Sequence, residues 1–172
     1  MKKIKVQLIG ETISTNESIA FSLNKKSSFG EKIGEKIQYT LSEAFFLLEK
    51  NKVEIYSKNK KISKTELLKK FQRIDKKFTI KYPVFKDLRK KGYIVKTALK
   101  FGADFRVYEK GKKPGKAHAK WIVFVEHESK KISWQEFSAK NRVAHSTKKN
   151  LLIAIIDEEA SISYYQVSWI KA

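Results

Sequence analysis

The chain contains no cysteine among its 172 residues and only two prolines. The absence of cysteine excludes disulfides, thiol catalysis and cysteine-based zinc sites, and it suits a reducing cytoplasm. Long apolar runs are also missing, since the longest clean run, LLIAII at residues 151–156, is far too short to span a bilayer. The basic start MKKIKVQLIGE lacks the continuous apolar stretch of a secretory signal. We therefore expect a cytoplasmic protein without a membrane segment.

Acidic residues are scarce relative to basic ones. The chain has 38 lysines and arginines against 18 aspartates and glutamates, which gives a net charge of +20. Such an excess favours a polyanionic partner, most simply a nucleic acid whose phosphates release counterions on binding. Hydrophobic residues still make up 41% of the chain, enough to bury a core. The composition therefore predicts a folded protein of one domain, or two small ones, that binds a polyanion.

The first part of the chain, residues 1–78, is predicted to be a small mixed α/β domain. Alternating apolar and polar residues at 3–13 and 53–57 indicate strands. Apolar residues at helical spacing indicate helices over 40–52 and 63–75, each with serine or threonine at its start to cap it.

The second part, residues 79–172, is predicted to be a mixed sheet flanked by helices. One helix is expected over 82–91, with Pro83 in its first turn and Gly92 just past its end. Another is expected over 133–150, where Ser133 and Glu136 have the spacing of a capping box. Strands are expected at 93–101, 104–110, 119–127, 151–157 and 162–171.

Tyr108 and His118 lie on the two sides of a loop that is rich in lysine and glycine. A surface histidine and a packed tyrosine are the ordinary interpretation of such residues. If the loop doubles back, however, the two side chains flank one site, and the lysines around them would hold a phosphate there. Because histidine gives or takes a proton near neutral pH, the pair is a candidate for acid–base chemistry. The loop lysines are Lys110, Lys112, Lys113 and Lys116.

Three further features have a structural and a functional interpretation. On one helix, Arg142, His145 and Lys149 would share a face, either solvated or directed at phosphates. Trp169 either packs in the core or offers a stacking surface to an unpaired base. The acidic residues Asp157, Glu158 and Glu159 form a solvated turn or an anionic plug for a basic pocket on another copy of the chain.

A loose metal-nuclease pattern is also present. Asp104 is followed later by Glu128, Ser129 and Lys130, an acidic residue and then an E-x-K triplet. In metal nucleases such carboxylates coordinate Mg²⁺. Triplets of this kind arise easily by chance in a chain with 33% charged residues.

The second part resembles the archaeal tRNA-splicing endonucleases, or tRNA-intron lyases, in four segments. These are GYIVKTALKFGADFRVYEKG, AHAKWIVFV, NRVAHSTKKNLLIAIID and ISYYQVSWIK. Before residue 79 the resemblance is limited to overall length and the order of helices and strands. The length is similar to that of the short, one-repeat form, which assembles as a homotetramer or with a second subunit type.

The resemblance implies a nuclease-like catalytic domain over 79–172, with residues 1–78 serving structure and assembly. It implies a catalytic triad of Tyr108, His118 and Lys149 that needs no metal or cofactor. Arg142 and Trp169 would hold a bulged base of precursor tRNA, although the family often has arginine at the latter position. The acidic loop at 157–159 matches one that docks into a neighbouring subunit.

The implied reaction cuts precursor tRNA at both intron boundaries in a bulge–helix–bulge RNA. It leaves a 2′,3′-cyclic phosphate and a 5′-hydroxyl. Three other interpretations remain open from the residues: a metal-dependent nuclease that uses Asp104 and Glu128, a non-catalytic RNA-binding module, and a structural subunit of a mixed complex.

Overall fold

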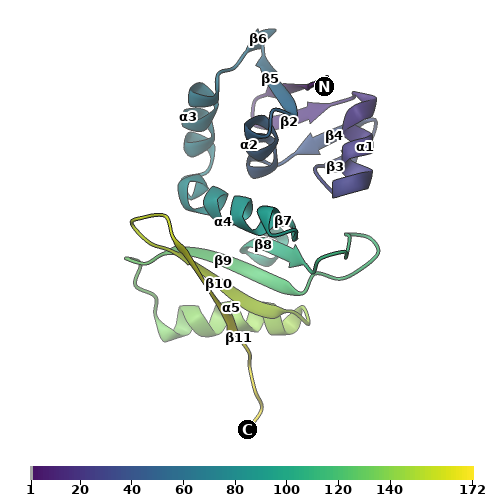
Figure 1. Cartoon of the computed structure of the whole chain (residues 1–172). Coiled ribbons are helices and arrows are strands. Elements are labelled where there is room, and N and C mark those ends of the chain that lie inside the picture. Colours follow the sequence, from purple (N-terminus) through teal and green to yellow (C-terminus); the bar gives the residue numbers. More distant parts are fainter. Residues whose placement is uncertain (1) are drawn as a thin grey trace. The chain divides into compact units, whose positions relative to one another are not determined.

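The computed structural model describes residues 2–172 and divides the chain into two compact units, with the boundary between Thr79 and Ile80 (Figure 1). Each unit combines helices with a mixed sheet, which confirms the predicted α/β fold class. Within residues 2–172, no helix is both long enough and apolar enough to cross a bilayer.

The N-terminal unit is built on a six-stranded sheet in the order β3-β4-β2-β1-β5-β6. The single strand predicted over 3–13 is wrong, because Gly10, with φ of +61°, turns the chain back between β1 and β2. The helix α1 was not predicted. The bounds are β1 Ile4–Ile9, β2 Thr12–Thr15, α1 Ser18–Ser27, β3 Glu31–Ile33, β4 Lys36–Tyr39, α2 Leu41–Glu49, β5 Val53–Ser57, β6 Lys60–Lys61 and α3 Lys64–Ile74.

The helices α2 and α3 confirm the predictions over 40–52 and 63–75. Thr40 and Ser63 each cap their helix through a complete capping box, in which a glutamate three residues later bonds back to the cap. The ring of Phe71, a residue of α3, packs edge-on against the rings of Phe45 and Phe78, with centroids 6.2 and 5.4 Å away. This aromatic cluster joins both helices to the last residues of the unit.

The C-terminal unit is built on a five-stranded sheet in the order β11-β10-β9-β8-β7. Only the β9–β10 pair is parallel, and the helix α5 connects these two strands. The predicted mixed sheet is thus confirmed. The bounds are α4 Phe78–Lys90, β7 Ile94–Ala98, the 3₁₀ turn η1 Leu99–Phe101, β8 Ala103–Tyr108, β9 Trp121–His127, α5 Trp134–Ser146, β10 Asn150–Ile156 and β11 Ile162–Val167.

The helix α4 begins four residues earlier than predicted, so Pro83 lies inside it and not in its first turn. A proline in a helix removes one backbone hydrogen bond, which made the sequence indicate a later start. The earlier start is held by Phe78, whose amide bonds to the carbonyl of Asp75 and whose ring packs on Phe71. Gly92 lies just past the end of α4 with φ of +92°, as predicted.

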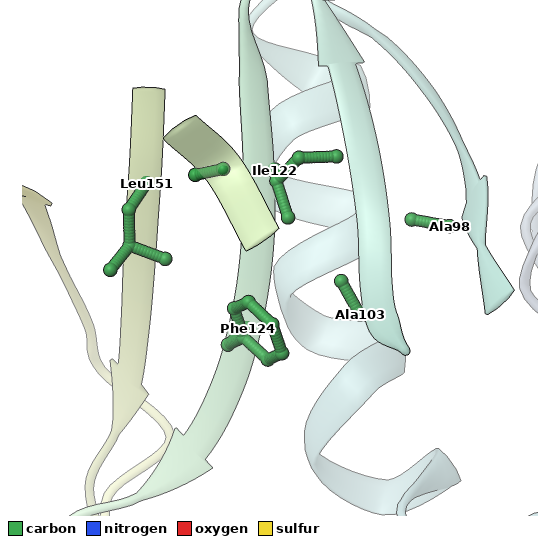
Figure 2. Packing of buried hydrophobic residues seen from close by; sticks show 6 residues of the cluster. Ala98, Ala103, Ile122, Phe124 and Leu151 are labelled. Carbon is green, nitrogen blue, oxygen red and sulfur yellow. The ribbon is translucent and has the colours of Figure 1, made fainter. Parts of the chain in front are cut away.

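One core cluster of the C-terminal unit lies between its sheet and α5. Figure 2 shows Ala98, Ala103, Phe124 and Leu151, which come from the neighbouring strands β7, β8, β9 and β10. Ala144 of α5 is buried in the same cluster. Because the alternation of the strands puts these residues on one face, α5 is held against β9 and β10 by apolar burial.

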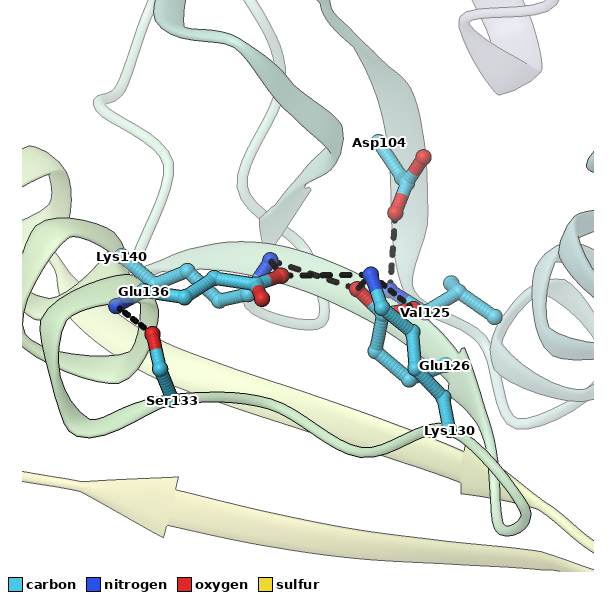
Figure 3. Close-up of polar contacts among 7 residues, drawn as sticks. All are labelled: Asp104, Val125, Glu126, Lys130, Ser133, Glu136 and Lys140. Carbon is cyan, nitrogen blue, oxygen red and sulfur yellow. Dashed lines mark hydrogen bonds and ion pairs between the residues drawn. The ribbon is translucent and has the colours of Figure 1, made fainter.

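A cluster of ion pairs links the N-terminal half of α5 to β9 (Figure 3). Glu126 of β9 lies 3.2 Å from the Nζ of Lys140 and 3.4 Å from that of Lys130, and both lysines also pair with Glu136. The Lys140 ammonium is additionally 4.3 Å from the ring centroid of Phe124. The Glu126 and Lys140 side chains are only 11% and 12% exposed, so this pair is far less screened than a surface pair.

Replacing Lys140 by methionine is expected to lower the free energy of unfolding by about 1–3 kcal/mol, because it leaves a buried carboxylate with one cation fewer. The urea midpoint of the C-terminal unit measures the effect. Lys131→Met removes an equal charge from an exposed residue and serves as the control. Equal midpoints for the two variants would contradict the role of the cluster.

Candidate functional site

The loop at residues 109–120 does double back, because β8 and β9 pair as antiparallel neighbours on either side of it. Val107 lies opposite Trp121, and the Lys120 amide donates to the Val107 carbonyl at 2.9 Å. Inside the loop, the amides of Lys116 and Ala117 both bond to the carbonyl of Lys113, forming a tight turn. The two ends of the loop therefore lie side by side.

Tyr108 is the last residue of β8 and is only 4% exposed. Its ring packs with Ile94 of the neighbouring strand β7 and with Ala119 at the end of the loop. The contact with Ala119 holds the adjacent residue, His118, which is exposed. The buried phenol of Tyr108 and the exposed imidazole of His118 thus approach each other from the two ends of the loop.

Lys149 is positioned by the turn that ends α5. The amides of Lys148 and Lys149 bond back to the carbonyls of His145 and Ala144, and Lys148 has φ of +54°, which together form a Schellman motif. The Lys149 ammonium donates to the carbonyl of Thr147 at 2.8 Å, at the helix end where a cation is favoured. The predicted helix over 133–150 therefore ends at Ser146, and Lys149 does not continue a helical row with Arg142 and His145.

One pocket of about 490 Å³ collects these elements. Tyr108, His118 and Lys149 all line it, so the structure brings the three predicted site residues together. The remaining lining residues are Phe101, Arg106, Gly115, Lys116, Ala117 and Ala119.

The pocket is strongly cationic. Arg106, Lys116 and Lys149 line it together with His118, and among the described residues no carboxylate lines it. The Lys149 ammonium also lies 5.8 Å from the ring centroid of Phe101, which holds it without neutralising it. Such a pocket is suited to an anion the size of a phosphate.

Another tyrosine of this unit, Tyr164, is held in a different state. Its hydroxyl donates to the Asp87 carboxylate at 2.7 Å. Burial, followed by this hydrogen bond and the charge of Asp87, raises the pKa of Tyr164 well above its usual range. Tyr164 therefore stays protonated and acts as a structural link between β11 and α4.

The two residues predicted to hold a base lie on different supports. Arg142 is an exposed residue of α5, and Trp169 lies beyond the last strand with 56% of its surface exposed. The Trp169 ring contacts His145 of α5, with centroids 4.6 Å apart and planes tilted by 53°. His145, which the sequence placed on a solvated or phosphate-directed face, thus contacts Trp169 from the helix that also carries Arg142.

The carboxylates of the metal-nuclease pattern have structural partners. Asp104 accepts a hydrogen bond from the Val125 amide at 2.8 Å and lies 3.9 Å from the Lys81 ammonium (Figure 3 shows the first contact). Glu128 accepts from the Glu158 amide at 3.1 Å. Across residues 2–172, no three histidine, aspartate or glutamate side chains gather into a group that could hold a metal ion.

In the acidic loop between β10 and β11, one carboxylate bonds within the loop and two are exposed. Asp157 accepts hydrogen bonds from the amides of Glu159 and Ser161, which closes the turn. The side chains of Glu158 and Glu159 are exposed. Asp157 therefore shapes the loop, and the other two carboxylates are accessible to another molecule.

Two family models match the chain. Residues 78–164 match the tRNA intron endonuclease, catalytic C-terminal domain, and residues 4–68 match the N-terminal domain of the same family. The resemblance of the N-terminal part is thus greater than its sequence suggested.

Full-length similarity extends to tRNA-splicing endonucleases of several archaea. The Pyrococcus horikoshii protein is 40% identical over 99% of this chain and 98% of its own length. The Methanothermobacter thermautotrophicus protein is 38% identical over 98% of this chain and 99% of its own length. The Nanoarchaeum equitans protein is 46% identical over 76% of this chain and 88% of its own.

Lys148→Gly is expected to raise the free energy of unfolding by about 1 kcal/mol, because glycine takes the left-handed backbone of the Schellman turn without the steric cost of a Cβ. Thermal unfolding measures the change. Ser146→Gly, two residues earlier and still helical, is the control and should lower stability. A Lys148→Gly variant with a lower free energy of unfolding than the unaltered protein would contradict a steric cost of the lysine Cβ in this turn.

Proposed function

The chain belongs to the tRNA intron endonuclease family, and we propose that its cationic pocket cuts precursor tRNA at both intron boundaries. It is an endoribonuclease of the tRNA-splicing type. The observation that carries the proposed chemistry is the pocket itself, which is lined jointly by Tyr108, His118 and Lys149.

The proposed reaction is an internal transesterification. The ribose 2′-oxygen attacks the adjacent phosphorus, forming a new P–O bond, while the bond from phosphorus to the 5′-oxygen breaks. The products are a 2′,3′-cyclic phosphate and a 5′-hydroxyl. Because the nucleophile belongs to the substrate, much of the entropic cost of bringing the reactants together is already met. The protein has to move two protons and stabilise one extra negative charge.

Tyr108 is the proposed base. Lys149, Lys116 and Arg106 line the same pocket, so the tyrosine is flanked by positive charge. Packing against Ile94 and Ala119 fixes the ring, which directs its oxygen toward the attacking 2′-hydroxyl. The tyrosine accepts the proton of that hydroxyl as the P–O bond forms.

His118 is the proposed acid, and Lys149 the proposed charge stabiliser. The exposed imidazole, in its protonated form, gives a proton to the departing 5′-oxygen. The ammonium of Lys149, anchored at the end of α5, offers positive charge to the non-bridging oxygens as the phosphorane develops. Tyr108, His118 and Lys149 belong to different structural elements. A substitution of one of them therefore removes one role and leaves the other two side chains in place.

Recognition is proposed to depend on RNA shape. Arg142 and Trp169 would hold a nucleotide that is flipped out of a bulge–helix–bulge RNA, since aromatic and guanidinium planes stack on any base. The contact with His145 supports one side of the Trp169 ring, and the exposed remainder is accessible for stacking. Such stacking contributes about 1–3 kcal/mol per base.

Two cuts on one substrate call for two sites at a fixed spacing, which we attribute to an assembly of four chains. The exposed Glu158 and Glu159 would dock into a basic surface of a neighbouring copy. The N-terminal unit is proposed to serve structure and assembly. A second subunit type in place of identical copies is the alternative.

The central test is cleavage of a bulge–helix–bulge RNA in EDTA. We expect the unaltered protein to cut and to leave cyclic phosphate and 5′-hydroxyl ends, which end-group analysis identifies. His118→Ala should be slower by about 10²–10⁴-fold, the usual contribution of a positioned acid. His127→Ala, outside the pocket, is the control. Loss of cleavage in EDTA would favour the metal-dependent alternative, and an unaffected His118→Ala variant would remove the assigned acid.

Charge reversal in the acidic loop is expected to dissociate the assembly. Sedimentation of the unaltered protein should give four chains, and the double variant Glu158→Lys, Glu159→Lys should sediment as a smaller species because two docking charges now repel a basic surface. The pair Glu31→Lys, Glu35→Lys makes the same change at two exposed residues, one in β3 and one in the turn after it. A monomeric parent protein would contradict assembly from identical copies.

A further inference from the structure

Arg106 lies in β8, an interior strand of the sheet of the C-terminal unit and the strand that ends with Tyr108. It pairs with Lys96 of β7 on one side and with Ile122 of β9 on the other. Because side chains two residues apart on a strand point to the same face, Arg106 and Tyr108 share a face, and both line the pocket. An arginine in this position is held by strands on both sides.

The guanidinium of Arg106 has an unsatisfied donor. Its Nε is buried and has no hydrogen-bond partner among the described residues. A buried donor without a partner destabilises a fold by about 1–3 kcal/mol, and a catalytic role or a bound ion is one explanation for such a group. The pocket gives that partner a route of entry.

The surroundings of Arg106 indicate the charge of this partner. No ion pair to Arg106 occurs within residues 2–172, and the described lining offers cations and no carboxylate. Three basic side chains around one small pocket repel one another until an anion is bound. A guanidinium moreover offers planar, paired donors that match two oxygens of a phosphate.

We propose that Arg106 is a further catalytic residue that binds a non-bridging oxygen of the scissile phosphate. This rests on the proposed function of the pocket. Lys149 supplies a compact charge from the end of α5, whereas Arg106 supplies directional donors from the sheet. The two cations hold the phosphate between them, with Tyr108 on the same strand as Arg106, and so align the phosphorus with the base.

The test compares Arg106→Gln and Arg106→Lys with the unaltered protein in single-turnover cleavage of a bulge–helix–bulge RNA at saturating enzyme. Arg106→Gln should cut about 10²–10³-fold more slowly, as when one donor to a developing oxyanion is removed. Arg106→Lys, which keeps the charge without the paired donors, should recover part of that loss. Arg73→Gln, an exposed residue of the other unit, is the matched control.

A second readout separates phosphate binding from a purely structural role. Sulfur replaces one non-bridging oxygen of the scissile phosphate at a time. For the oxygen that Arg106 contacts, sulfur should slow the unaltered protein but should not slow Arg106→Gln further, because the contact is already lost. A sulfur effect of equal size in both proteins, or an Arg106→Gln variant as fast as the control, overturns the proposal.

His118→Ala in the same assay keeps the two proposals distinguishable. If His118→Ala is slow and Arg106→Gln is fast, only the role of Arg106 fails. If His118→Ala is fast as well, the proposed function of the pocket fails with it. Thermal unfolding of each variant shows whether a slow Arg106→Gln protein is folded, and a folded, slow variant that retains the full sulfur effect also counts against the proposal.

Discussion

The pairing of β8 with β9 is the interaction on which the site depends. Its last hydrogen bond, from the Lys120 amide to the Val107 carbonyl, closes the lysine-rich loop. Closure places Ala119 against Tyr108 and so brings His118 to the pocket. Without it, a phenol and an imidazole ten residues apart would have no fixed relation. A backbone contact thus fixes the relative positions of Tyr108 and His118, the proposed base and acid.

The other half of the site depends on how α5 ends. The Schellman turn at Lys148 stops the helix and directs Lys149 into the pocket, and the ion pairs of Glu126 with Lys140 and Lys130 keep the helix on the sheet. Two independent supports, a strand pair and a helix end, therefore converge on one cationic cavity. Part of the large positive charge of the chain lies there, because the described lining of the pocket contains several cations and no carboxylate.

Much of this arrangement could be predicted from local sequence signals. Thr40 and Ser63 cap helices at whose starts a serine or threonine was expected, Ser133 caps the helix that its spacing to Glu136 indicated, and the strands of the second part form one sheet. Signals failed where the deciding interaction was distant or atypical. The turn that ends α5 has Lys148 in the left-handed backbone conformation, and a glycine at this position would have indicated the turn from the sequence. The predicted strand 104–110 already places Arg106 on the face of Tyr108, but only the fold shows that this face lines a pocket.

The most direct test of the central claim is a crystal structure of the protein with a bulge–helix–bulge RNA made uncleavable by a 2′-deoxy nucleotide at the cut. We expect the scissile phosphate in the pocket, with the Tyr108 hydroxyl near the 2′-position. We also expect the His118 ring near the 5′-oxygen and the Lys149 ammonium about 3 Å from a non-bridging oxygen. A phosphate bound elsewhere, with these three groups out of reach of its phosphorus, would contradict the proposed roles.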